Sequence, residues 1–206
     1  TTQSISATTS GSYTVQVTNA SGCQSASSAA TSITVTAMPS TTISYSGTPY
    51  CSSAGFATVT LTGNTGGSFT SDANLAIDAS SGTINLSSST AGTHTVTYKI
   101  AASGGCSQFS TTTTITITTQ PYATGFYPNT PYCSNIGTLM PTGTYNGLLG
   151  TLSASPSGLS INSSTGVIDV SASTPGSYTV YYNVPANGGC SAYSANAPLV
   201  ISTAPS

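Results

Sequence analysis

The chain has 206 residues, and only four of them carry a full charge at neutral pH: Lys99, Asp72, Asp78 and Asp169. Nucleic-acid binding needs a basic surface, so this class is nearly excluded, as is electrostatic attachment to anionic membranes. No apolar run approaches the roughly 20 residues that a membrane-spanning helix needs, so we expect no membrane insertion. Dense Thr, Val, Ile and Tyr favour β-sheets, with hydroxyl groups rather than charges providing solubility.

One motif occurs three times along the chain. Alternating apolar and hydroxyl residues at 11–17, 92–100 and 176–182 are each followed by a turn that contains glycine and ends in a cysteine. These cysteines, Cys23, Cys106 and Cys190, recur at a nearly constant interval. Such a fixed period indicates an array of similar small domains, and the alternation predicts a half-buried strand in each.

Residues 1–39 correspond to the back half of a repeat. We expect strands at 12–18 and 31–36, joined through a turn at 19–23. Half a sandwich leaves an apolar face open, so this segment should be poorly ordered or paired with something. Because residue 1 falls inside a repeat, we expect the chain to belong to a longer one, and the short proline-containing linker at 38–40 predicts semi-rigid spacing.

Residues 40–119 and 120–206 each form a complete repeat, with the second linker at Gln120-Pro121. Turns rich in Gly, Ser and Asn separate seven candidate strands per repeat, as expected for an all-β sandwich. The expected strands of the first complete repeat are 42–46, 56–62, 67–70, 74–78, 83–87, 93–101 and 108–118. Those of the next are 122–127, 137–143, 148–154, 159–162, 167–171, 177–184 and 192–202.

Two further alignments support this division. Thr48-Pro49-Tyr50-Cys51-Ser52 matches residues 130–134, and residues 75–78 with 82–86 match residues 159–162 with 166–170. Together with the Gly-Ser-Tyr-Thr-Val and Gly-Gly-Cys motifs, this order resembles the tandem immunoglobulin-like repeats of large Bacteroidota surface adhesins, including gliding-motility adhesins exported by type IX secretion. The resemblance covers essentially the whole chain. It implies tandem seven-stranded immunoglobulin-like β-sandwiches, a location outside the cell at its surface, and neighbouring repeats of the same chain as partners.

The cysteines predict disulfides formed within repeats. Cys51 and Cys106 lie in one repeat, and Cys133 and Cys190 lie at nearly the same spacing in the next. Paired spacing in small β domains indicates disulfides and an oxidising compartment. We therefore expect the bonds Cys51–Cys106 and Cys133–Cys190, with Cys23 unpaired in this chain. A metal site would need Cys-x-x-Cys or clustered Cys and His, and the sequence has neither.

Catalysis has few candidate residues. The only histidine, His94, takes the place of Tyr13 and Tyr178 in the repeated strand motif, so we expect it to fill a tyrosine corner rather than act as a base. A position of His94 in a pocket beside Asp72 or Asp78 would favour an enzyme. Lys99 is interpreted as a solvated strand residue.

The carboxylates are expected in local turns. Asp78 aligns with Asn162, and Asp169 with Asn85, an interchange typical of Asx-turns. Calcium would need several oxygen ligands, and no loop has the dense aspartate spacing of known calcium motifs, so we expect no metal or other cofactor.

Tyrosines near the start of each complete repeat are weighed as a sugar-stacking surface, with Tyr50 and Tyr132 as candidate glycan contacts. Packing in the core or between domains is the preferred interpretation. The threonine-rich stretch 111–118 is likewise interpreted as one sandwich strand rather than an ice-binding array.

The sequence thus favours a non-enzymatic stalk segment of an extracellular adhesin, spacing and presenting a distal adhesive region. A glycan-binding module that contacts surface polysaccharide, and a subunit of an extracellular filament, remain as alternatives.

Overall fold

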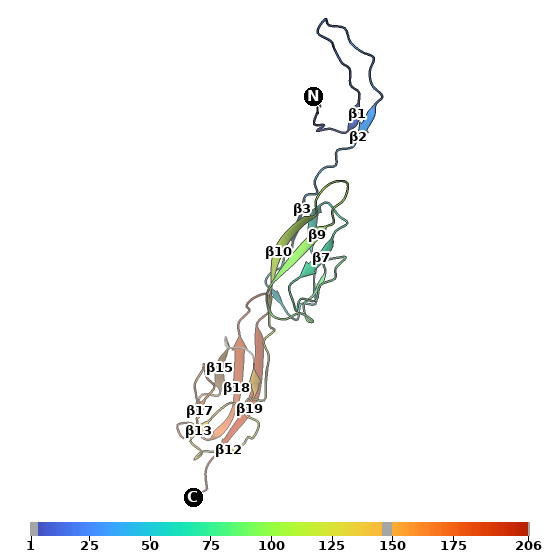
Figure 1. The fold of residues 1–206 in the computed structure, drawn as a ribbon. Coiled ribbons are helices and arrows are strands. Elements are labelled where there is room, and N and C mark those ends of the chain that lie inside the picture. Colours follow the sequence, from blue (N-terminus) through green and yellow to red (C-terminus); the bar gives the residue numbers. More distant parts are fainter. Residues whose placement is uncertain (1–3, 146–149, 206) are drawn as a thin grey trace.

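The computed structural model describes residues 4–145 and 150–205, which contain strands and turns and no helix. The chain is elongated: an N-terminal two-stranded segment, a central β-sandwich and a C-terminal β-sandwich follow one another lengthwise (Figure 1). The prediction of an all-β chain of tandem immunoglobulin-like sandwiches is confirmed, but the described residues form eight strands in the central sandwich and nine in the C-terminal one rather than the seven expected in each.

The N-terminal segment has no core of its own. Strands β1 (Gly11–Tyr13) and β2 (Thr31–Ile33) pair antiparallel with each other. None of its described residues is buried, and large apolar side chains such as Val15 and Val17 are exposed. These apolar side chains are therefore uncovered, as expected of half a sandwich.

The central sandwich has two layers. One is a four-stranded sheet in the order β4-β10-β9-β7, and the other contains the pairs β3-β6 and β5-β8. Its strands are β3 (Thr41–Ser44), β4 (Tyr50–Cys51), β5 (Phe56–Ala57), β6 (Thr60–Gly63), β7 (Ser68–Ser71), β8 (Ile84–Asn85), β9 (Gly92–Ile100) and β10 (Phe109–Thr118).

The C-terminal sandwich repeats this plan. Its four-stranded sheet has the order β12-β19-β18-β15, and the second layer contains β13-β17-β16 and β11-β14. The strands are β11 (Ala123–Thr124), β12 (Tyr132–Cys133), β13 (Thr138–Leu139), β14 (Thr144–Tyr145), β15 (Thr151–Ser155), β16 (Ser160–Ile161), β17 (Ile168–Asp169), β18 (Gly176–Val184) and β19 (Tyr193–Ser202).

The repeated motif forms one of the two inner strands of each four-stranded sheet, β9 in the central repeat and β18 in the C-terminal one. Along β9 the side chains of His94, Val96 and Tyr98 are buried, while Thr95 and Lys99 on the opposite face are exposed. This alternation follows from the two-residue period of a strand with one face in the core. The buried positions of β18 are equivalent to those of β9, so the same alternation of side chains contributes to the cores of both repeats.

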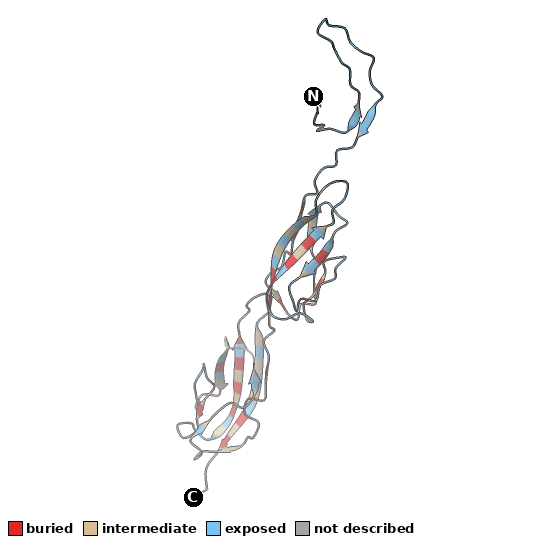
Figure 2. Ribbon diagram, viewed as in Figure 1, coloured by how far each residue is buried: buried red, intermediate tan, exposed pale blue. Residues whose placement is uncertain are grey.

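Each sandwich encloses its own apolar core (Figure 2). The central core lies within residues 43–117 and the C-terminal core within residues 123–201. Ile84 and Ile168 occupy equivalent fully buried positions. Two separate cores allow each sandwich to pack independently, so whatever fixes one repeat to the next must lie at their junction.

Several expected strands differ from the structure. Those at 12–18, 31–36, 83–87, 122–127, 137–143, 159–162 and 167–171 are reduced to the short strands β1, β2, β8, β11, β13, β16 and β17, and the start of the expected strand at 148–154 lies outside the described residues. Residues 56–62 form two short strands, because β5 pairs with β8 while β6 pairs with β3. Residues 74–78 form no continuous strand: Asn74 has a positive φ of 70°, the Ile77 amide bonds the Leu75 carbonyl, and Ile77 makes an isolated β-bridge with Ile84. The sequence analysis also missed β14, and it missed β4 and β12, two-residue strands that run parallel to the ends of β10 and β19.

Candidate functional site

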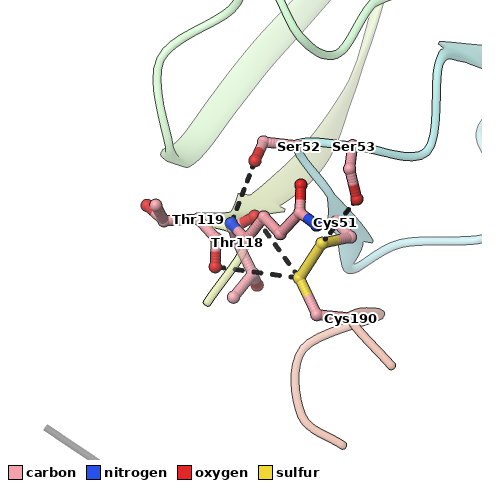
Figure 3. The surroundings of a disulfide bond; sticks show 7 residues. Cys51, Ser52, Ser53, Thr118, Thr119 and Cys190 are labelled. Atoms are coloured by element: carbon pink, nitrogen blue, oxygen red, sulfur yellow. Dashed lines mark hydrogen bonds between the residues drawn. A yellow bond between two sulfur atoms is a disulfide. The ribbon is translucent and has the colours of Figure 1, made fainter. Parts of the chain in front are cut away.

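A disulfide joins the two sandwiches. Cys51, in β4 of the central repeat, is bonded to Cys190, in the turn between β18 and β19 of the C-terminal repeat (Figure 3). The two Cα atoms lie 4.6 Å apart although 139 residues separate them in sequence. The predicted bonds Cys51–Cys106 and Cys133–Cys190 are therefore wrong, because the bond links repeats rather than closing a loop within one.

The physical reason is that the two cysteines of one repeat lie near opposite ends of its last strand, β10 or β19. Cys51 lies opposite Thr118, the last residue of β10, whereas Cys106 lies in the turn that precedes this strand. A ten-residue strand spans roughly 30 Å, and a disulfide needs Cα atoms within about 7 Å. Cys51 and Cys106 therefore lie at opposite ends of one sandwich. Cys133, opposite Ser202 at the end of β19, is separated from Cys190 in the same way.

Polar contacts surround the bond on the central repeat. The Ser52 amide donates to the Thr118 carbonyl at 2.8 Å, and the Gln120 amide donates to Ser52 Oγ at 3.0 Å. The Cys190 sulfur lies 3.8 Å and 3.7 Å from the carbonyl oxygens of Thr118 and Thr119 (Figure 3). The linker after β10 is thus held against the residue that follows Cys51.

Two glycines bring the turn of Cys190 close to the central repeat. A Cβ on Gly189 would lie 2.2 Å from the Pro49 carbonyl oxygen, and one on Gly188 would lie 2.3 Å from Thr118 Oγ1. Both residues also have positive φ angles, of 80° and 56°. Glycine is needed at Gly189 for conformation and for close approach, so the Gly-Gly-Cys motif works as a docking turn.

The other three cysteines carry free thiols. Cys23 and Cys133 are exposed, and Cys106 is half-buried at the junction with the N-terminal segment. Among the described residues, no group of three or more His, Cys, Asp or Glu side chains is close enough to hold a metal ion. The described part of the chain likewise has no helix long and apolar enough to cross a membrane.

His94 occupies the predicted corner. Its Nε2 lies 3.0 Å from the Thr90 carbonyl oxygen, four residues earlier in the chain. Tyr178 makes the same contact through its hydroxyl to the Thr174 carbonyl at 2.5 Å, and Tyr13 bonds the Thr9 carbonyl at 2.7 Å. All three repeats thus fix the start of this strand with one side-chain bond to backbone, as in a tyrosine corner.

His94 also contacts a carboxylate, which the sequence analysis named as a feature that would favour an enzyme. Its Nδ1 lies 2.9 Å from Asp72 Oδ1, while Asp72 Oδ2 accepts a bond from the Thr95 amide at 3.1 Å. The Thr95 amide first, and His94 second, lower the pKa of Asp72. Since Nε2 faces a backbone carbonyl and the ring is buried, neither ring nitrogen of His94 is directed at a substrate-sized space. The arrangement braces a strand.

The other carboxylates cap turns, as their alignment with asparagine predicted. Asp78 Oδ1 accepts bonds from the hydroxyl and amide of Ser80 and the amide of Ser81, and these bonds lower its pKa. The Ser171 hydroxyl and the Ala172 amide lower the pKa of Asp169 in the same manner.

Tyr50 and Tyr132 are half-buried, and each packs against the core of its own repeat. The Tyr50 hydroxyl accepts a bond from the Gly47 amide at 2.9 Å, and the Tyr132 hydroxyl accepts one from the Asn129 amide at 3.2 Å. Both hydroxyls therefore brace the turns before β4 and β12. Glycan contact at these residues stays a prediction.

The most informative site is thus the junction, and sequence reasoning found its cysteines without finding its geometry. The sequence analysis included Ser52, Gly189 and Pro49 only as members of aligned motifs and assigned them no role at a junction. The repetition of Thr-Pro-Tyr-Cys-Ser together with Gly-Gly-Cys was the available signal, because both motifs recur without an apparent local role.

No protein-family model matches the sequence, and no curated protein matches it significantly. Solved structures with a similar arrangement include the insect immune protein hemolin, at 10% identity and a TM-score of 0.46, with 94% of this chain and 56% of hemolin covered. The immunoglobulin domains 1–5 of Sidekick-1 share 15% identity at a TM-score of 0.42, with 96% and 48% covered. This chain thus spans about half the length of these two structures.

A third similar structure is a SusE-like surface-located polysaccharide-binding protein from the heparin utilisation locus of Bacteroides thetaiotaomicron. It shares 18% identity at a TM-score of 0.28, with 78% of this chain and 34% of that protein covered. At these scores the similarities identify no ligand, partner or activity for this chain.

Proposed function

We propose that the chain is a structural segment of an extracellular, repetitive surface adhesin of the Bacteroidota type, in which β-sandwiches space and present a distal adhesive region. The observation that carries this proposal is the disulfide between Cys51 and Cys190, because it fixes one repeat to the next. A covalent bond at a junction between two separate cores limits bending and separation of the repeats, and a spacer requires both limits.

The surface of the chain supports this role. With four charged residues among 206, the chain offers little to attract charged molecules, and its solubility depends on hydroxyl and amide groups. Such a surface resists nonspecific electrostatic capture and is insensitive to ionic strength. The side chains that could suggest catalysis or metal binding, His94 and the aspartates, are engaged in strand and turn contacts. The proposal therefore assigns the chain no enzymatic activity and no cofactor.

The proposed spacer role is tested by measuring how far the chain can hold a binding domain away from the surface to which it is anchored. The chain is placed between a cell-surface anchor and a small binding domain, and capture of a ligand-coated bead is measured across a polymer layer of varied thickness. We expect capture through thicker layers than with an unstructured linker of equal length, and a loss of that advantage in the Cys51→Ser, Cys190→Ser variant. Equal capture by the three chains would contradict the proposal.

A panel of polysaccharides tests the binding alternative on the same chain without its added binding domain. Saturable binding that is lost on Tyr50→Ala or Tyr132→Ala would replace the spacer by a glycan-binding module. Phe56→Ala is a suitable control, since Phe56 is an exposed aromatic residue outside these turns.

A further inference from the structure

We propose that Cys106 and Cys133 are halves of further inter-repeat disulfides, and that the partner of each is another repeat of the same type. The observed bond Cys51–Cys190 would then be one rung of a ladder. In this ladder, the cysteine of Thr-Pro-Tyr-Cys in one repeat is joined to the cysteine of Gly-Gly-Cys in the next. The inference goes beyond the spacer role, because it would hold equally for an array of repeats that binds a ligand.

The first observation is the position of the Cys106 sulfur. It lies 3.6 Å from the Thr36 carbonyl oxygen and 3.7 Å from that of Ala37. Cys190, which is bonded, has its sulfur 3.8 Å and 3.7 Å from the corresponding carbonyls of the preceding repeat, those of Thr118 and Thr119. The free thiol therefore occupies the same place against its preceding segment as the bonded sulfur does.

The turn that holds this thiol is also in its docked conformation. The amide of Cys106 donates to the Ser103 carbonyl at 2.9 Å, as the amide of Cys190 does to Asn187. The φ angles are 56° and 82° at Gly104 and Gly105, and 56° and 80° at Gly188 and Gly189.

The two turns differ in what they face. Pro49 lies against Gly189, whereas no described residue other than its chain neighbours lies within 4 Å of a Cβ built on Gly105. The open side of Gly105 is thus where a Pro-Tyr-Cys segment of a preceding repeat would lie. Such a segment would bring its cysteine to Cys106 as β4 brings Cys51 to Cys190.

The opposite half of a rung is present at Cys133. Strand β12 runs parallel to the end of β19, as β4 does to β10. The Ser134 amide donates to the Ser202 carbonyl at 2.8 Å, and the Ala204 amide donates to Ser134 Oγ at 3.1 Å. Ser52 makes the corresponding bonds with Thr118 and Gln120 at 2.8 Å and 3.0 Å.

The sites of Cys51 and Cys133 differ in how far the cysteine is exposed. Cys51 is 5% exposed beneath the docked turn, whereas Cys133 is exposed. The environment of Cys133 is therefore built like that of Cys51 without a turn upon it. A Gly-Gly-Cys turn fits because its second glycine lets the backbone approach the proline before the cysteine, here Pro131, where any side chain would overlap the proline carbonyl.

Forming a rung removes two electrons and two protons from a pair of thiols. A small-molecule disulfide such as oxidised glutathione supplies the oxidising equivalent by exchange. One cysteine thiolate attacks it, one glutathione leaves, and the second cysteine displaces the other glutathione from the mixed disulfide. The products are one protein disulfide and two molecules of reduced glutathione.

The ladder has a mechanical consequence. The segment from Cys106 to Cys133 is nearly equal in length to the segment from Cys23 to Cys51. In a continuous ladder, a pulling force is carried along one such segment, which runs from the Gly-Gly-Cys cysteine of one repeat to the Thr-Pro-Tyr-Cys cysteine of the next. It then crosses the disulfide at that cysteine and continues in the equivalent segment two repeats further on. Only these segments can lengthen, which limits the extension to roughly 90–100 Å for every two repeats, however far the sandwiches unfold.

The test for Cys133 uses the full chain followed directly by a second copy of residues 120–206. The protein is reduced, reoxidised with oxidised glutathione and digested under non-reducing conditions for mass spectrometry. We expect a new peptide linking Cys133 to the copied equivalent of Cys190, in addition to Cys51–Cys190. A free Cys133 in molecules that contain Cys51–Cys190, or a bond within the added copy, would overturn the ladder. With Cys133→Ser in the original chain, the copied equivalent of Cys190 should stay reactive to thiol reagents.

The test for Cys106 places a second copy of residues 40–83 before residue 1, which supplies the front half of the first repeat. We expect the copied equivalent of Cys51 to join Cys106. Pairing with Cys23 instead would mean that cysteines pair within repeats at this end, and would overturn the proposal. Reach across a polymer layer does not enter either measurement, so a failed spacer role and a failed ladder give different results.

Discussion

The turn that contains Gly189 lies so close to Pro49 that a Cβ on the glycine would be 2.2 Å from the proline carbonyl oxygen. Gly105 has nearly the same φ angle, 82° against 80°, but in the part of the chain that the structure describes no residue beyond its neighbours lies within 4 Å of its Cβ position. The two glycines thus share one backbone strain and differ in one contact. Alanine at Gly189 would introduce both the strain and the overlap at the Cys51–Cys190 junction, whereas alanine at Gly105 would introduce the strain in the turn of Cys106.

Gly189→Ala should slow formation of the Cys51–Cys190 bond. The overlap with Pro49 forces the turn away, and such overpacking costs about 1–3 kcal/mol, which corresponds to a decrease of roughly 5- to 150-fold in the docked population. The rate of oxidation by oxidised glutathione measures this change. Gly105→Ala is the control, because it places an alanine at nearly the same φ in the turn of Cys106, away from the Cys51–Cys190 junction, and it should leave this rate unchanged. A similar slowing in both variants would show that general destabilisation of the chain, and not the contact with Pro49, is responsible.

Removing either half of the observed disulfide should have the same effect on stability. Cys51→Ser and Cys190→Ser both open a loop of 139 residues, which the chain-entropy model values at about 5 kcal/mol at most. Cys106→Ser and Cys133→Ser should change the free energy of unfolding much less, since both thiols are free. Chemical denaturation of the four variants measures this, and loss of stability in Cys106→Ser equal to that in Cys51→Ser would contradict the observed pairing.

The same loop predicts the length of the unfolded chain under force. With the ends of the chain attached, the bond between Cys51 and Cys190 hides 139 residues from extension. Reduction should therefore increase the contour length of the fully unfolded chain by about 460–500 Å. Single-molecule pulling in the presence and absence of reductant measures this gain. Bonds within repeats, Cys51 to Cys106 and Cys133 to Cys190, would hide shorter loops and release roughly 370–400 Å in total.

The failure of the pairing prediction shows where sequence spacing stops being informative. The regular interval between Cys23, Cys106 and Cys190 reports the repeat, and the alternation at 92–100 and 176–182 reports local structure; both predicted the fold. The number of residues between Cys51 and Cys106 shows only that a disulfide between them could close a loop of ordinary length. It does not reveal that β4 lies at the far end of β10, because a two-residue strand has no periodicity of its own.

His94 was predictable for the opposite reason. Its position in an aligned strand, where Tyr13 and Tyr178 stand, fixed its role from local register alone. The contact with Asp72 was not predictable, because β7 and β9 meet only in the folded sheet and the third repeat has Pro156 at the aligned position. Features set by one strand could thus be read from the sequence, while features set by two elements could not.

Exchange of the corner residues should be asymmetric. His94→Tyr keeps a donor for the Thr90 carbonyl and should cost much less stability than His94→Ala, which removes a buried ring and its bonds at a cost of roughly 3 kcal/mol. Tyr178→His should cost more than His94→Tyr, because Pro156 offers no carboxylate to the second ring nitrogen. Urea denaturation of the three variants checks the order, and equal losses for all three would show that corner bonds contribute little.

The depressed pKa of Asp78 predicts how the central repeat responds to acid. Bonds from Ser80 and Ser81 favour the ionised carboxylate in the folded state and so lower its pKa below the ordinary value of 3.8. A lowered folded pKa means that this contribution is fully present above about pH 4, and is lost as the pH falls from there through the folded value. Asp78→Asn should keep the turn, because Asn162 accepts the corresponding bonds from the amides of Ser164 and Thr165.

The expected result is that Asp78→Asn flattens the dependence of unfolding free energy on pH between 4 and 2, with little change at pH 7. Asn162→Asp provides the reverse exchange in the other repeat and should make that dependence steeper. Urea midpoints measured at each pH give both slopes. If Asp78→Asn leaves the acid slope unchanged while Asn162→Asp also has no effect, the carboxylate bonds in these turns do not favour the ionised form, and the turns are held by their backbone bonds alone.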